Sequence, residues 1–246
     1  MMKEVFLLSE AKEYDRYMNC IAGRKQHVPL QHITGEQDFM GLTYIVNRNV
    51  LIPRQDTEVL VEEVMRHLHD GMRILDMCTG SGCILLSLLR YSNDCTGVGV
   101  DISKEALRVA VQNTARILGA QAIEQGKVTL QQGNLFDGLN PEDKFDIIVS
   151  NPPYIKTSVI ERLMPEVRDY EPHLALDGQE DGLFFYRQII AQAGRFLMGG
   201  GMLFFEIGYD QGECVSRLME EAGYIDIEVI KDFAGLDRVV FGGSHV

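Results

Sequence analysis

From residue 73 onward, short apolar segments alternate with longer segments in which apolar residues recur at helical spacing. The short segments have the length and the β-branched content of buried strands. Strands that alternate with helices in this way form a mostly parallel sheet with helices on both faces, so we predict a doubly wound α/β fold with seven strands. We expect the last two strands to form an antiparallel pair. The predicted strands are 73–77, 96–100, 127–131, 145–150, 201–207, 224–230 and 237–241.

The region before this alternation has a different pattern. Apolar residues at helical spacing before residue 34 predict a helix that covers the main core with Tyr14, Tyr17, Met18 and Ile21. Residues 39–52 alternate in polarity, and the sequence Asn-Arg-Asn at 47–49 predicts the turn of a β-hairpin there. An amphipathic helix is predicted to open at 56–58 and to run to about Leu68.

Polar residues follow the predicted strands at their carboxyl ends. Ligands of doubly wound folds bind in the crevice outside these ends, at the point where the strand order reverses. Distant parts of the chain therefore meet around one predicted site. The residues concerned are Thr79, Asp101, Asn134 and Asn151.

A glycine-rich turn follows the first of these strands. Thr79-Gly80-Ser81-Gly82 separates the strand from a helical run, and such a turn lets a ligand approach the backbone closely. It has neither the full G-x-G-x-x-G pattern nor the lysine of a P-loop. Asp101, about twenty residues on at the end of the next strand, can accept both hydroxyls of a ribose. It can also simply cap the helix that opens at Ser103.

The loop after strand 145–150 has a composition suited to binding an amino group. Pro152 and Pro153 have fixed φ and no N–H, so the carbonyl groups of this rigid loop lack local donors. Asn151 adds a side-chain carbonyl oxygen, and Tyr154 adds a flat ring that can pack on a planar group. We predict that the Asn151 side chain and the Pro152 carbonyl accept both hydrogens of a planar –NH₂. The alternative is that the two prolines only stiffen the end of the strand and that the loop has no catalytic role.

Taken in order, these segments resemble the motifs of class I S-adenosylmethionine-dependent methyltransferases, and more narrowly those of the HemK/PrmC type, the peptide chain release factor N5-glutamine methyltransferases. The Asn-Pro-Pro-Tyr loop alone is shared with DNA adenine methyltransferases. The Ile-Pro-Arg segment at 52–54 and the Glu-Pro-x-x-Ala-Leu segment at 171–176 narrow the resemblance. It extends over most of the chain, to Glu-Ile-Gly at 206–208 and Ala-Gly-Leu-Asp-Arg at 234–238.

The resemblance implies a role for each site residue. The residues implied for S-adenosylmethionine binding are Asp76, Cys78, Thr79, Gly80, Ser81, Gly82, Asp101, Ile102, Asn134, Leu135 and Asn151. Those implied for catalysis are Asn151, Pro152 and Tyr154. Those implied for acceptor binding are Asn151, Pro152, Pro153, Tyr154, Phe39, Pro53 and Arg54. Asn134 stands where the family usually has an acid for the cofactor adenine, and its carbonyl can still accept from an exocyclic amine.

Two charged residues have open interpretations. Arg54 can line the acceptor pocket or pair with Glu58, four residues on along the predicted helix. Glu206 ends a predicted strand and can face the crevice or cap local backbone groups.

The resemblance also suggests a division of the chain. Residues 1–52 are expected to form a short helical segment plus a β-hairpin, a truncated form of the substrate-recognition region that the family carries. Residues 53–246 are expected to form the methyltransferase domain.

The reaction implied is methyl transfer from S-adenosylmethionine to the side-chain amide nitrogen of a glutamine, in the Gly-Gly-Gln sequence of release factors. An orienting loop suits this chemistry, because an amide nitrogen is a poor nucleophile that a base cannot deprotonate near neutral pH. Three alternatives stay open: glutamine methylation of a ribosomal protein, N6-methylation of adenine in nucleic acid, and cofactor binding without catalysis.

Composition and charge limit the class of binding partner and the cellular compartment that we predict. A formal net charge of −13 and the lack of a basic patch argue against direct nucleic-acid binding and favour a protein substrate. We see neither a targeting segment nor a membrane span, which predicts a cytoplasmic protein without membrane partners. The five cysteines form no C-x-x-C pair and are predicted to be reduced and mostly buried. We predict no metal site.

Overall fold

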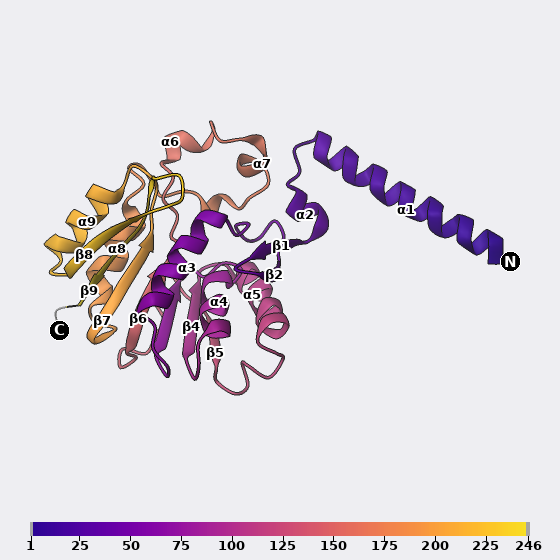
Figure 1. Ribbon diagram of the computed structural model, residues 1–246. Helices are drawn as coiled ribbons and strands as arrows, with labels where there is room; N and C mark the ends of the chain where they lie inside the picture. Colours follow the sequence, from indigo (N-terminus) through magenta and orange to yellow (C-terminus); the bar gives the residue numbers. More distant parts are fainter. Residues whose placement is uncertain (1, 245–246) are drawn as a thin grey trace.

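The computed structural model describes residues 2–244, with side chains from Glu13 onward (Figure 1). Its strands are β1 (Glu36–Phe39), β2 (Leu42–Ile45), β3 (Arg73–Met77), β4 (Thr96–Asp101), β5 (Val128–Gln132), β6 (Phe145–Ser150), β7 (Leu197–Glu206), β8 (Ile225–Lys231) and β9 (Asp237–Gly243). Its helices are α1 (Met2–Lys25), α2 (Leu30–Thr34), α3 (Gln55–His67), α4 (Cys83–Tyr91), α5 (Lys104–Ile117), α6 (Thr157–Ile160), α7 (Pro165–Arg168), the 3₁₀ turn η1 (His173–Ala175), α8 (Phe184–Ala193) and α9 (Gly212–Glu221).

The predicted sheet is confirmed. Within the described residues, seven strands pair in the order β5-β4-β3-β6-β7-β9-β8. The first five are mutually parallel, and β9 runs antiparallel to both β7 and β8. The chain builds outward from β3 in one direction and then returns to add β6 on the other side. The reversal of strand order therefore lies between β3 and β6, where the fold favours a ligand crevice.

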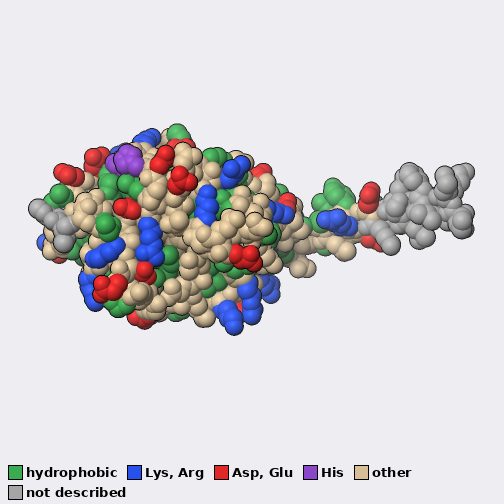
Figure 2. All heavy atoms as spheres, turned by 90° about the horizontal axis from the view of Figure 1, so that it is seen from below, with side chains coloured by type: hydrophobic (Ala, Val, Ile, Leu, Met, Phe, Trp, Pro, Cys, Tyr) green, Lys and Arg blue, Asp and Glu red, His purple; other side chains and the backbone are tan. Residues whose placement is uncertain are grey.

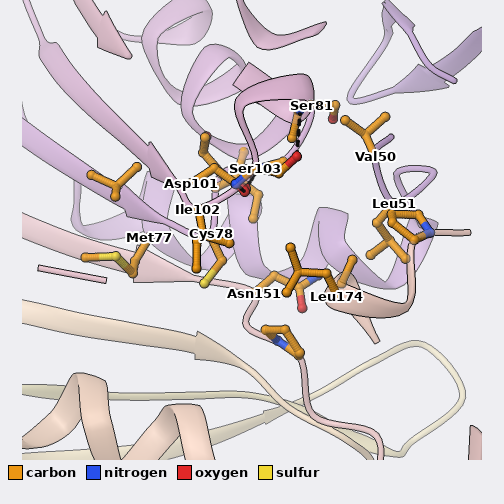
Figure 3. Close-up of a pocket in the computed structure, with 18 of the residues that line it drawn as sticks. Val50, Leu51, Met77, Cys78, Ser81, Asp101, Ile102, Ser103, Asn151 and Leu174 are labelled. Atoms are coloured by element: carbon orange, nitrogen blue, oxygen red, sulfur yellow. Dashed lines mark hydrogen bonds between the residues drawn. The ribbon is translucent and has the colours of Figure 1, made fainter. Parts of the chain in front are cut away.

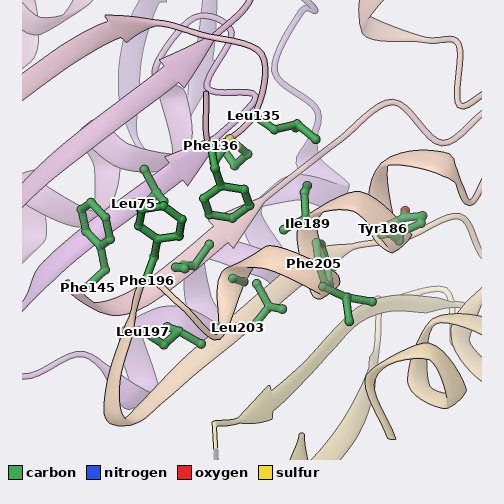
Figure 4. Close-up of a cluster of buried hydrophobic side chains, with 14 of the residues drawn as sticks. Leu75, Leu135, Phe136, Phe145, Tyr186, Ile189, Phe196, Leu197, Leu203 and Phe205 are labelled. Carbon is green, nitrogen blue, oxygen red and sulfur yellow. The ribbon is translucent and has the colours of Figure 1, made fainter. Parts of the chain in front are cut away.

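Two apolar cores flank the sheet. Helices α3 and α4 cover one face, and α8 and α9 cover the other (Figure 1). Alternate residues of β3 face opposite cores, as a pleated strand requires: Ile74 packs with α3 and α4, whereas Leu75 packs toward α8. Figure 4 shows the second core, in which the Phe136 and Phe196 rings stack with centroids 4.9 Å apart. These cores hold the strand ends that carry the site.

The predicted hairpin turn at 47–49 is wrong. The structure turns at Met40 and Gly41, both with positive φ, which joins β1 to β2 by two residues. Asn47 opens a separate turn instead, because its side chain accepts from the Asn49 N–H at 2.9 Å. The segment after this turn continues as an extended stretch toward α3.

The prediction that the first helix covers the core is also wrong. In its described part, Tyr14 and Tyr17 are 64% and 62% exposed, and Met18 is exposed as well. Helix α1 projects away from the rest of the molecule (Figure 1). Apolar side chains lie exposed on its described part (Figure 2). Periodic apolar spacing indicated the helix but not a partner for it.

The β1–β2 hairpin shares a core with the sheet. Phe39 and Tyr44 are buried among residues of α3 and α4, with their rings 6.0 Å apart. The Tyr44 hydroxyl bonds to Ser87 Oγ of α4 at 2.8 Å. The division of the chain after residue 52 stays a prediction, and the described contacts across it are extensive.

Phe39→Ala is expected to lower the free energy of unfolding by about 3–5 kcal/mol, because a buried ring leaves a cavity that its neighbours fill only in part. Chemical denaturation with urea would measure the change. Phe233→Ala is the matched control, since that ring is 96% exposed and its removal opens no cavity. Equal stability of the two variants would contradict the packing described for the hairpin.

Two further observations bear on sequence predictions. No helix within the described part of the chain is long and apolar enough to span a membrane. All five cysteines are free, with Cys83 and Cys95 buried and Cys214 exposed, so the expectation that most are buried is wrong.

Candidate active site

One cavity lies at the carboxyl ends of β3, β4, β5 and β6, where the sequence predicts the site (Figure 3). It encloses about 1250 Å³ of space, including its opening to solvent. Predicted site residues that line it are Cys78, Thr79, Gly80, Ser81, Asp101, Ile102, Asn134, Leu135, Asn151, Pro153 and Pro53. The strand ends therefore bring these separate segments together around one space.

The glycine-rich turn is held in place from two sides. The Thr79 N–H donates to the Val100 carbonyl at 3.0 Å, and its hydroxyl donates to Asp76 Oδ2 at 2.5 Å. Gly80 and Gly82 have positive φ, and so does Cys78, at 63°. A left-handed backbone at a non-glycine residue stores strain, which is common at ligand sites. Asp76 and Gly82 support this turn from behind and do not line the cavity.

Burial makes the Asp76 carboxyl a weaker acid than usual. The side chain is fully buried in β3, and desolvation raises the pKa of its carboxyl to about 7, against the opposing effect of the Thr79 hydroxyl. The folded protein therefore holds a proton that the unfolded chain releases between about pH 4 and pH 7. Stability should fall as pH rises through this window, since the folded state binds more protons there.

Asp76→Asn is expected to flatten this pH dependence, by up to about 1.4 kcal/mol per pH unit within the window. Urea denaturation of both proteins between pH 5 and pH 8 would measure it. The difference between the two curves isolates Asp76, because other ionisable groups are common to both. Parallel curves would contradict a protonated Asp76 in the folded state.

Asp101 joins β4 to the glycine-rich turn. Its Oδ2 accepts from the Gly80 N–H at 2.8 Å, and its Oδ1 accepts from the Ser103 N–H at 2.9 Å. The residue that caps α5 is Ser103, not Asp101, and Asp101 supports the helix entry by accepting from the Ser103 N–H. The carboxylate also lines the cavity, where each oxygen has a further lone pair for a ligand hydroxyl.

An apolar wall adjoins this carboxylate. Ile102 is about half exposed although it is apolar, and Leu135 has positive φ in the loop after β5. Asn134 is exposed beside Leu135 and lines the same part of the cavity. Two aliphatic side chains with polar groups at their edges suit a flat heterocycle joined to a sugar.

The Asn-Pro-Pro-Tyr loop closes the other side of the cavity. Asn151 Nδ2 makes a long hydrogen bond of 3.4 Å to Thr57 Oγ1 in the first turn of α3. Both prolines are buried, and Pro153 lines the cavity. Tyr154 packs against the α8 core, and its hydroxyl donates to Glu206 Oε1 at 3.2 Å. Burial raises the pKa of the Tyr154 hydroxyl, so it stays protonated as a donor.

One predicted acceptor contact and one predicted ion pair need correction. Phe39 is 1% exposed, and its ring lies in the core beneath the hairpin, so it cannot touch a bound acceptor. Arg54 forms an ion pair with the buried carboxylate of Glu171, not with Glu58. Glu58 accepts from the Met40 N–H instead, at 2.6 Å. Arg54 therefore fastens the 171–175 segment, part of which lines the cavity, to the start of α3.

Sequence reasoning missed part of the cavity wall. Thr57 touches Asn151, and its only signal was its place at a helix start. Other lining residues outside the predicted set lie in the turn after β2, in the η1 region and at the start of α8. They include Asn49, Val50, Leu51, Leu174, Ala175, Phe184 and Phe185. Pro172 lines the cavity too, in a loop that the sequence places beside the site.

Comparison with known proteins agrees with this geometry. A family model described as methyltransferase domain matches residues 68–223. A protein of Clostridium acetobutylicum named release factor glutamine methyltransferase is 43% identical over 233 residues, 93% of this chain and 79% of the relative. One of the same name from Geobacter sulfurreducens is 44% identical over 90% of this chain and 75% of its own length. The chain belongs to the release factor glutamine methyltransferase family.

Solved structures support the fold of this family member. A methyltransferase from Pyrococcus furiosus superposes with a TM-score of 0.61 at 16% identity, covering 96% of this chain and all of that one. A ribosomal protein L11 methylase from Lactobacillus delbrueckii gives a TM-score of 0.55 at 20% identity, over 78% of this chain and 81% of that one. At these identities the likeness concerns the fold alone, and the membership in the release factor glutamine methyltransferase family comes from the sequence relatives.

Proposed function

We propose that this chain transfers a methyl group from S-adenosylmethionine to the side-chain amide nitrogen of a glutamine in a peptide chain release factor. The observation that carries the proposal is the orientation of Asn151 at the cavity. Its amide nitrogen is engaged by Thr57, which leaves its carbonyl oxygen for a donor inside the cavity. An acceptor with a planar –NH₂ group matches that oxygen.

The cavity residues fit the proposed cofactor. The Asp101 carboxylate suits the two hydroxyls of its ribose, and Ile102 and Leu135 suit the faces of its adenine. Asn134 can accept from the adenine amine. The turn at 78–81 offers close backbone approach for the methionine part. Bound S-adenosylmethionine supplies a methyl group on a positively charged sulfur.

The acceptor loop would act by orientation. The Asn151 carbonyl oxygen and the Pro152 carbonyl accept the two hydrogens of the glutamine amide and thereby fix its plane. The nitrogen lone pair is then aimed along the line of transfer, which lowers the entropic part of the barrier. Both carbonyl dipoles also favour the positive charge that develops on nitrogen. No base is needed before the transfer.

A release factor as the acceptor is supported by the names of the sequence relatives and by charge. The relatives at 43% and 44% identity are named for this substrate class. A net charge of −13 favours a protein partner over a nucleic acid, whose phosphates an acidic surface repels. Cytoplasmic location is part of this proposal, because release factors act there.

The test is methyl transfer to a purified release factor, located by peptide mass spectrometry. A single added methyl at the glutamine of the Gly-Gly-Gln sequence is expected. A release factor in which that glutamine is replaced is the control and should gain none. Absence of transfer with cofactor binding intact would overturn the release factor assignment, and ribosomal protein and nucleic-acid acceptors would then be tried in turn.

A further inference from the structure

Glu206 is a buried carboxyl that the proposed transfer step does not use. It ends β7, the neighbour of β6, and Ser150 pairs with Phe205 just before the two strands reach Asn151 and Glu206. The residue is only 2% exposed. Its backbone carbonyl accepts from the Tyr186 hydroxyl of α8 at 2.9 Å, which fixes the strand end. A carboxyl in such a place needs donors around it.

One donor comes from the end of the Asn-Pro-Pro-Tyr loop. Tyr154, the last residue of the loop, donates its hydroxyl to Glu206 Oε1 at 3.2 Å. The second oxygen, Oε2, is buried and has no hydrogen-bond partner among the described residues. The Thr57 side chain, which contacts Asn151 at the other end of the loop, lies close enough to this carboxyl to oppose the rise in its pKa.

The Thr57 hydroxyl can link this carboxyl to Asn151, because Oε2 is a buried acceptor without a donor. A hydroxyl has one hydrogen, and when Oε2 accepts it Thr57 can only accept from Asn151. Asn151 must then turn its NH₂ group toward Thr57, as the 3.4 Å contact records, and its carbonyl oxygen toward the cavity. The reverse orientation would present an NH₂ group to the acceptor and repel it.

We propose that Glu206 is a positioning residue, which acts through Thr57 and Tyr154 to hold the Asn151 carbonyl oxygen toward the methyl acceptor. The inference rests on the proposed function, since an –NH₂ acceptor is what that orientation serves. Glu206 itself does not line the cavity, whereas Thr57 does.

The charge of Glu206 gives this arrangement a pH dependence. Desolvation raises the pKa of the carboxyl to about 7. Ionised Glu206 accepts from both hydroxyls, whereas the protonated form can donate to Thr57 and release the constraint on Asn151. The groups that face it are Arg238 of β9, which lowers its pKa, Asp56 of α3, which raises it, and the Tyr154, Tyr186 and Cys83 side chains.

The first test is kinetic. Glu206→Gln and Thr57→Val should each lower kcat by about 10- to 100-fold, the effect of one or two charge-assisted hydrogen bonds, with little change in cofactor affinity. Thr57→Ser keeps the hydroxyl and should restore most of kcat. Glu63→Gln is the matched control, because Glu63 is also a buried carboxyl but lies away from the cavity. Equal losses in Thr57→Ser and Thr57→Val would overturn the hydroxyl link.

The second test is the pH profile of kcat. Wild-type activity should rise with pH through about 7, where Glu206 ionises, and Glu206→Gln should lose that rise. Asp76 is common to both proteins, so the difference between the two profiles reports on Glu206. An unchanged profile in Glu206→Gln would overturn the inference.

The third test needs no acceptor, so it separates this inference from the proposed function. The ¹⁵N–¹H signal of the Asn151 side-chain amide, identified by its loss in Asn151→Ala, should shift with pH in the wild type. It should move in Thr57→Val and stop responding to pH in Glu206→Gln. A signal that shifts neither with pH nor in Thr57→Val would overturn the inference even if release factors are methylated. Failure of methylation with the expected signals would instead overturn the proposed function alone.

Discussion

Asn151→Ala is expected to lower kcat for methyl transfer by about 100- to 1000-fold, the range seen when one preorganised polar group that favours a transition state is removed. Alanine removes the oxygen that would fix the acceptor amide and leaves the backbone of the loop in place. The Asp101 side of the cavity, on the next-but-one strand, is untouched. Cofactor affinity should therefore change little.

Single-turnover transfer to a release factor, together with calorimetric titration of the cofactor, would measure both quantities. Asn140→Ala is a suitable control, because Asn140 is an exposed turn residue that does not line the cavity. Its activity should equal that of the wild type. Retained turnover in Asn151→Ala would remove the loop from the mechanism and leave Asn151 as a purely structural contact of Thr57.

Asp101→Ala is expected to weaken cofactor binding by about 100-fold, since each hydrogen bond to a charged acceptor contributes about 1.5–3 kcal/mol. The same change leaves the Gly80 and Ser103 N–H groups without their acceptor. The glycine-rich turn should loosen, so part of the loss reflects disorder of the site before binding.

Asp101→Asn separates these two effects. Its single carbonyl oxygen can still accept from one of the backbone donors, but the negative charge that favours the hydroxyl groups is gone. We expect an affinity between those of the wild type and Asp101→Ala in calorimetric titration. Binding of equal strength in all three proteins would show that another group holds the ribose.

The sheet was predictable because its signals are local. Strands β3, β4 and β6 are short apolar runs with β-branched residues, and the helices that follow β3 and β4 favour parallel pairing. Thr79, Asp101, Asn134 and Asn151 reach one cavity for the same reason, since carboxyl ends of parallel strands share an edge. The observed strand order shows in addition that β3 and β6 are neighbours.

The errors come from interactions that no local pattern encodes. Asn47 and Asn49 are good turn residues and attracted the predicted hairpin, but the chain turns at Met40 and Gly41, a pair without the usual Asn-Gly signal. The partner of the Tyr154 hydroxyl, Glu206, lies 52 residues further on, and only the folded sheet brings the two together. The contact of the Tyr154 ring with the acceptor stays a prediction. Phe39 was likewise assigned to the acceptor and belongs to the core.

The position of β9 between β7 and β8 constrains how the molecule assembles. Strand β8 precedes β9 in the chain but reaches the sheet only through it, so strands cannot be added in chain order from β7 outward. Either the β8–β9 hairpin docks as a unit or β9 arrives first. Val240 then completes one core and Val239 the other, while Arg238 reaches Asp56 beside the acceptor loop at 3.4 Å. Docking of β9 therefore completes both cores of the sheet and the support of the acceptor loop in one folding step. The kinetic stability of these three parts consequently depends on the same strand.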